Sequence, residues 1–255
     1  MTHDHDCDCH HPVALTAEDL EPGAPYPPLR RESDQRRALE LYQEGFKRRT
    51  DDLARQLRAG ELSVAEWELA MRDEVRDLHV GATVIGRGGD RRSVSFSEWG
   101  RVGAYIKQQY RFLHGFAQTV ERSAMDALTG QGDFPTQAYL SWRSNLYAGG
   151  GKASYYRGKY LGMLPQVPGD GQTRCLGNCN CVLRFEEGQY PWVVNVYWEL
   201  RPGESCPDCL RLASEWNPYT LELPVGLDAG TVAYWLSLGP EEFPLDRRAA
   251  LALGT

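Results

Sequence analysis

The chain contains the stretch Cys175-Leu-Gly-Asn-Cys179-Asn-Cys181 and, after 24 residues without cysteine, the stretch Cys206-Pro-Asp-Cys209. Together these stretches hold five of its seven cysteines. Cysteine groups at these spacings, on either side of a short β-structure, are typical of a structural zinc site in which four thiolates surround one ion tetrahedrally. The sequence therefore predicts a small module that a metal ion holds together.

Two runs between the cysteine groups favour β-strands. Residues 182–187 and 192–200 are rich in β-branched and aromatic side chains, and the turn between them contains Gly188 and Pro191. If the runs pair across this turn, the numbers of facing residues sum to about 379, which places Cys175 opposite position 204, close to Cys206. We therefore expect the cysteine groups to meet at the open end of an antiparallel hairpin.

The candidate metal ligands are Cys175, Cys179, Cys181, Cys206 and Cys209, one more than a structural zinc site uses. Cys179 and Cys181 are two residues apart, so both side chains point to the same side of an extended segment. We favour Cys175, Cys179, Cys206 and Cys209 as the ligands, with Cys181 as the first substitute. Iron in place of zinc stays open, because both metals accept four thiolates.

Two other interpretations of the cysteines stay open. Cys206-Pro-Asp-Cys209 precedes a helix-like run, and this spacing is also found in redox-active pairs. A thioredoxin-like protein needs a strand–helix–strand pattern around such a pair, and no such pattern precedes this one. Reduced cysteines can also pack as small apolar side chains without a metal. Since the N-terminus lacks the layout of a secretory signal, we expect a reducing cytoplasm, where disulfides are rare.

The formal net charge of −7 is unevenly distributed. Residues 30–163 hold 22 Lys and Arg against 17 Asp and Glu, whereas the rest of the chain holds 6 against 18. A weak positive balance spread over helices is usual for a solvated surface, and the acidic total disfavours a dedicated DNA-binding protein. No apolar run approaches the length of about 18 residues that a membrane span needs.

The apolar periodicity of residues 33–163 predicts helices. The first carries apolar residues at helical spacing up to Leu57 and is expected to end at Gly60. Ser63-Val-Ala-Glu66 is a capping box that starts a second helix, which the Gly-rich stretch 86–89 ends. A third helix is expected to start after Ser97 and to end at 130–133. A fourth is expected after Pro135, with an interruption at the glycines 149–151.

Other motifs carry no function. Gly149-Gly-Gly-Lys152 is similar to a phosphate-binding loop, but Leu146 and Ala153 occupy positions where that loop needs Gly and Ser or Thr. His79 and His114 are lone histidines on predicted helices, and neither is a credible catalytic metal ligand. No nucleophile, base and orienting group occur at a recognised spacing, so we predict a protein without enzymatic activity or a small-molecule substrate.

The two ends of the chain are predicted to be unstructured. The N-terminal segment is rich in proline and holds a possible soft-metal chelating set, which we expect to be unimportant because a flexible peptide must be ordered on binding. That set consists of His3, His5, Cys7, Cys9, His10 and His11.

The segments 164–181, Tyr197-Trp-Glu-Leu200, Glu204-Ser-Cys-Pro-Asp-Cys209 and Ala213-Ser-Glu-Trp-Asn-Pro-Tyr219 resemble the C-terminal part of minor head, or head morphogenesis, proteins of tailed phages. The long helices before them, with Ser97-Glu-Trp99 opening the third, resemble the helical body of the same proteins. The resemblance implies a virion component made in the host cytoplasm. It implies action near the portal during head assembly, with portal or other capsid proteins as partners and packaged DNA as a further partner.

We therefore predict an α+β protein with a disordered or extended tail over 1–31, a helical body over 32–165, a zinc-stapled β-hairpin module over 166–219 and an irregular tail over 220–255. The module is too small to be stable without its metal. We expect Trp192, Trp198, Trp216 and Tyr219 to pack over the metal site or onto the helices. A phage minor head component is the predicted function. A zinc-dependent nucleic-acid-binding protein is the first alternative, and a redox protein that uses Cys206 and Cys209 is the second.

Overall fold

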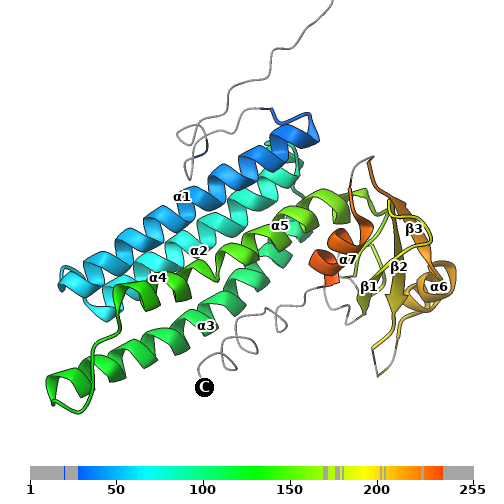
Figure 1. Cartoon of the computed structure of the whole chain (residues 1–255). Helices are drawn as coiled ribbons and strands as arrows, with labels where there is room; N and C mark the ends of the chain where they lie inside the picture. The colour runs from blue at the N-terminus through cyan, green and yellow to red at the C-terminus, as the bar shows by residue number, and fades with distance from the viewer. Residues whose placement is uncertain are drawn as a thin grey trace, which may run out of the picture.

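The computed structural model describes residue 20 and residues 28–168, 172–175, 179, 181–201, 203, 205–224 and 227–237 (Figure 1). In this part of the chain, long helices pack side by side, and a small antiparallel sheet with two short helices lies at one end of them. The predicted α+β class is confirmed. The elements are α1 (Glu32–Ala59), α2 (Val64–Gly86), η2 (Arg91–Ser93), α3 (Phe96–Leu128), α4 (Gln137–Asn145), α5 (Ala148–Tyr160), η3 (Leu161–Met163), β1 (Val182–Glu187), β2 (Val193–Glu199), α6 (Pro207–Glu215), β3 (Tyr219–Glu222) and α7 (Ala229–Ser237).

The first two helices begin and end where the sequence predicts. Gly60 follows α1 with a φ of 74°, in the left-handed region that glycine adopts without strain. Ser63 and Glu66 form the predicted capping box at the start of α2. Side chains spaced three and four residues apart on α2, including Trp67 and Met71, are fully buried against α1 and α3. These contacts form the centre of the helical body.

The third helix starts earlier than predicted. Its N-cap is Ser95, whose hydroxyl accepts a hydrogen bond from the backbone N–H of Glu98, and the Glu98 carboxylate binds the Ser95 backbone in return. This second capping box places the first helical residue at Phe96, so the prediction of a start after Ser97 was wrong. The predicted end at Gly130 is confirmed, because α3 ends at Leu128.

The glycines 149–151 do not interrupt a helix, so this prediction was also wrong. The break falls at residues 146–147, and α5 runs through the glycines from Ala148 to Tyr160. A Cβ atom on Gly151 would lie 2.8 Å from Leu78 Cδ1, and one on Gly158 would lie 2.7 Å from the Thr83 carbonyl oxygen. The glycines therefore let α5 approach α2 more closely than side chains would permit.

The sheet has three strands in the order β1-β2-β3, with both pairs antiparallel. Val182 faces Glu199, so the numbers of facing residues sum to 381, two more than the register that the sequence predicts. The added strand β3 pairs with β2, and α7 packs against β1 and β2. The prediction of an irregular tail over 220–255 was thus wrong for 220–222 and 229–237.

The sheet, α6 and α7 share a second hydrophobic core. Trp198 of β2 and Trp216 pack edge to face, with ring centroids 5.6 Å apart, and both are buried. The core also contains Tyr160, the last residue of α5, which joins the module to the helical body. Trp192 is 48% exposed, so its expected burial was wrong. Because α7 and α5 contribute to this core, the module is larger than the predicted hairpin.

Part of the predicted N-terminal tail is packed. Leu20 and Leu29 are each 2% exposed and belong to the core of the helical body. The backbone N–H of Leu29 donates to the Gly88 carbonyl oxygen at 2.8 Å. The histidines and cysteines of residues 3–11 lie outside the described residues. No helix in the described part has the length and apolar character that a membrane crossing requires.

Candidate metal centre

Two of the candidate ligands lie at the first turn of α6. Cys206 is the N-cap residue in extended conformation, and Pro207 at the first helical position fixes a backbone angle suited to starting a helix. Cys209 follows in the same turn and is fully buried in the second core. The helix start therefore directs one thiol into the protein interior and holds another at its edge.

The loop that carries Cys175 is attached to the same turn of α6. The backbone N–H of Arg174 donates to Asp208 Oδ2 at 2.8 Å, and the Arg174 guanidinium lies 3.8 Å from that carboxylate. This contact joins positions 34 residues apart in the sequence. It places Cys175 Sγ 3.9 Å from Cys209 Sγ.

The remaining two candidate ligands, Cys179 and Cys181, lie just before β1. Cys181 directly precedes Val182, the first residue of β1, and Val182 faces Glu199 near the end of β2. The chain leaving β2 leads to α6, so Cys179 and Cys181 lie beside its first turn. Cys179 Sγ lies 3.5 Å from Cys209 Sγ.

All five predicted ligands are therefore brought together. They form two groups of three that share Cys209, and within each group the sulfur atoms lie within 4.8 Å of one another. One group is Cys175, Cys206 and Cys209, and the other is Cys179, Cys181 and Cys209. Four sulfurs at about 2.3 Å from one zinc ion are about 3.8 Å apart. The separations of 3.5 and 3.9 Å around Cys209 are close to that value, but no four of the described cysteines form a single group at that spacing.

The thiols have different acidities. Hydrogen bonding with the Cys175 thiol, followed by the backbone N–H of Cys209, lowers the pKa of Cys206 to about 7. Burial, followed by hydrogen bonding with Cys206, raises the pKa of Cys209. A buried neutral thiol without a metal is thus the favoured state of Cys209, whereas a bound cation deprotonates the thiols that coordinate it. Binding of a metal at this site would therefore release protons.

The chemistry of the donor set fits a soft or borderline metal ion. Thiolate sulfur is the ligand that zinc, copper(I) and iron–sulfur clusters select, and hard ions such as magnesium prefer oxygen. Cys209 belongs to the core that also contains Trp198 and Trp216, and the four half-buried cysteines pack against this core. An ion bound here would link the loop at Cys175, the start of β1 and the start of α6.

The surroundings of Cys206 and Cys209 differ from those of a thioredoxin-like pair. The strands before α6 form an antiparallel hairpin, and no parallel strand–helix–strand unit is present in the described residues. Sequence reasoning missed Asp208 as the residue that orients the Cys175 loop. Its position between the two cysteines of the pair is the only local signal for that role.

The lone histidines lie away from the cysteines. His79 is buried in α2, and its Nδ1 lies 2.6 Å from the Ser154 hydroxyl oxygen. Burial, followed by the nearby Arg157 charge, lowers the pKa of His79 to about 3. His114 lies on the surface with Nδ1 3.2 Å from Glu68 Oε1. Both have structural partners.

Comparison with protein families, with curated proteins and with solved structures found no match for this chain. The fold and the cysteine cluster are therefore the basis on which this protein can be classified. They form a helical body joined to a small α+β module that contains a cluster of five cysteines.

Proposed function

We propose that this protein is a zinc-stapled structural component of a tailed-phage head. The observation that carries the proposal is the convergence of Cys175, Cys179, Cys181, Cys206 and Cys209 at one place in the fold. These cysteines belong to the segments that resemble minor head proteins. In this function the zinc ion stabilises the module, and the module and helical body together offer surface to portal or other capsid proteins.

Zinc is the metal that suits a purely structural role. It has no redox chemistry, and four thiolates satisfy its tetrahedral coordination and leave no open position for a substrate. The surroundings of Cys209 resemble such a closed site, because that residue is fully buried. We propose Cys175, Cys179, Cys206 and Cys209 as the ligands, with Cys181 as the spare thiol.

The first test measures the metal content per chain by elemental mass spectrometry, on protein purified without a histidine tag. A variant lacking residues 1–19 removes the N-terminal histidines and cysteines but keeps Leu20 and Leu29, which are buried in the core. We expect one zinc ion per chain in both proteins. Loss of zinc from the shortened variant would assign the metal to the N-terminal segment instead. Iron in place of zinc would contradict the choice of metal.

The second test concerns the partner. The zinc-loaded protein, the portal protein of the same phage and a double-stranded DNA fragment are combined in pairs and analysed by size-exclusion chromatography at low salt. We expect coelution with the portal, and DNA retention that is weaker than portal binding. Tight, salt-dependent DNA binding without portal binding would favour the nucleic-acid-binding alternative. Absence of the protein from purified virions would contradict a role in the mature head.

A further inference from the structure

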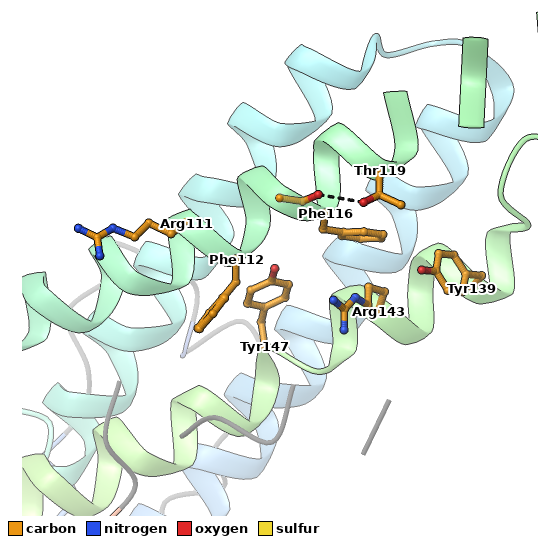
Figure 2. A pocket seen from close by; sticks show the side chains of 8 residues that line it. Arg111, Phe112, Phe116, Thr119, Tyr139, Arg143 and Tyr147 are labelled. Atoms are coloured by element: carbon orange, nitrogen blue, oxygen red, sulfur yellow. Dashed lines mark hydrogen bonds between the residues drawn. The ribbon is translucent and has the colours of Figure 1, made fainter. Parts of the chain in front are cut away.

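The helical body has a groove between α3 and α4. Residues of α3, of α4 and of the α4–α5 junction line a hollow of about 230 Å³ (Figure 2). Aromatic side chains of these elements face into it, and two of them, Phe116 and Tyr147, are each only 3% exposed. Small-molecule sites usually measure about 300 to 1,000 Å³. The hollow therefore has room for one large side chain rather than for a complete cofactor.

Basic side chains are part of the groove lining. Arg111 and Arg143 line it, and the described lining residues include no acidic side chain. The Arg143 guanidinium carbon lies 5.5 Å from the centre of the Phe116 ring. The buried aromatic rings present little ring face for stacking a nucleic-acid base, which would need an open platform. The groove instead suits an apolar or aromatic side chain that carries acidic neighbours.

Such a segment lies at the turn of the β1–β2 hairpin. Tyr190 and Trp192 stack there with ring centroids 5.1 Å apart, and they are 51% and 48% exposed. Glu187 precedes the turn, and Glu222 of β3 faces Val193, the residue after Trp192. We define these four residues, Glu187, Tyr190, Trp192 and Glu222, as the hairpin tip. The tip combines two exposed aromatic rings with exposed carboxylates.

We propose that the hairpin tip of one copy of this protein docks in the α3–α4 groove of a second copy. The hairpin lies beyond one end of the helices and α4 lies along their body, so the tip does not reach the groove of its own chain (Figure 1). The local charges match, because Arg111 and Arg143 line the groove and the exposed Glu187 and Glu222 flank the two rings of the tip. Trp192 enters the hollow, and Arg111 and Arg143 face the carboxylates of the tip.

The contact is heterologous, because the groove and the tip are different surfaces. Each copy therefore keeps one free groove or one free tip, and the assembly grows into a ring or an open filament. One hairpin turn in one groove buries less area than the roughly 1,200 Å² of a stable interface. We expect weak association that depends on protein concentration and weakens with salt.

One variant is designed to close the groove. Gly115 lines the hollow, and a Cβ atom added there meets nothing within 4 Å. Gly115→Leu fills the hollow and also raises the helix propensity of α3. Gly103→Leu is the matched control, because Gly103 lies on the same helix, has the same open space and does not line the groove.

A second variant removes the tip. Trp192→Ala deletes an exposed ring, and Tyr234→Ala is its control, because Tyr234 on α7 is 50% exposed. The full-length, metal-loaded proteins are compared by sedimentation velocity at low and at high salt. We expect concentration-dependent association for the unmodified protein and both controls, and monomers for Gly115→Leu and Trp192→Ala.

Mixing the two variants gives the decisive result. Gly115→Leu keeps an intact tip and Trp192→Ala keeps an intact groove, so an equimolar mixture forms a 1:1 dimer that cannot grow further. A mixture that stays monomeric, while the unmodified protein associates, would overturn the proposal, as would an unmodified protein that is monomeric at every concentration. The outcome is independent of portal binding, and the metal content of each sample is measured separately.

Discussion

Cys179 Sγ lies 3.5 Å from Cys209 Sγ, although 30 residues separate them in the sequence. The first residue precedes a strand, and the second is buried in the first turn of a helix. The contact therefore closes the module across its antiparallel hairpin.

Removal of the metal should loosen the module and leave the helical body folded. The helical body and the module have separate hydrophobic cores, and the long helices pack around the core of the helical body. A strong chelator should abolish the near-ultraviolet circular dichroism of Trp198 and Trp216, which pack edge to face in the core that contains Cys209. The far-ultraviolet helical signal should keep most of its intensity. Simultaneous loss of both signals would show that the body depends on the metal.

Cys209→Ser should have the largest effect on metal binding, because Cys209 belongs to both groups of sulfur atoms. In competition with a chelating dye, we expect zinc occupancy to fall from one per chain to below about a tenth. Cys181→Ser is the matched comparison and should keep its zinc. The double variant Cys7→Ser, Cys9→Ser should also keep it. If Cys181→Ser loses zinc as completely as Cys209→Ser, Cys181 replaces one of the four proposed ligands.

Gly158→Ala should destabilise the helical body, because the added methyl group would lie 2.7 Å from the Thr83 carbonyl oxygen. We expect a loss of about 1 to 3 kcal/mol in the free energy of unfolding, measured with urea. Gly149→Ala is the control on the same helix, since its Cβ meets nothing within 4 Å. The control should be neutral or more stable by up to about 1 kcal/mol. Equal effects would contradict the close packing of α5 on α2.

Acid should destabilise the protein through His79. Its pKa is about 3 in the folded protein and about 6.5 in an unfolded chain. On acidification, His79 therefore binds its proton at a higher pH in the unfolded state than in the folded state. The contribution of neutral His79 to the free energy of unfolding is fully present above pH 6.5 and is lost as the pH falls toward 3. Between pH 7 and pH 5 this loss is about 2 kcal/mol.

The measurement for His79 is urea unfolding at both pH values. His79→Gln should reduce the pH dependence, because glutamine does not titrate. The surface variant His114→Gln serves as the control and should behave like the unmodified protein. An unchanged pH dependence in His79→Gln would assign the effect to other groups.

The sequence predicts those parts of the fold that depend on neighbouring residues. The capping box of Ser63 and Glu66 and the left-handed Gly60 are local signals, and both are confirmed. The glycines of α5 were misjudged because their role depends on Leu78 and Thr83 of another helix. The four-residue strand β3 and the helix α7 carry weak periodicity, and their stability comes from packing on β2 and β1.

For the candidate site, the sequence predicted which cysteines come together but not how they are arranged. Cysteine spacing indicated all five thiols, because ligands on short segments impose regular intervals. The division of the thiols into two groups around Cys209 was not predictable, since it depends on the burial of one side chain and on the contact between Arg174 and Asp208. The register shift of two residues has another origin, because the turn between Glu187 and Val194 is longer than its glycine and proline indicate.

The continuity of α5 has a mechanical consequence. Tyr156 stacks on Tyr160 and on Trp235 of α7, and Tyr160 is buried in the core of the module. Gly151 and Gly158 hold the same helix tightly against α2. A force applied to the hairpin would thus be transmitted through α5 to the helical body. The module and the helical body would then move together.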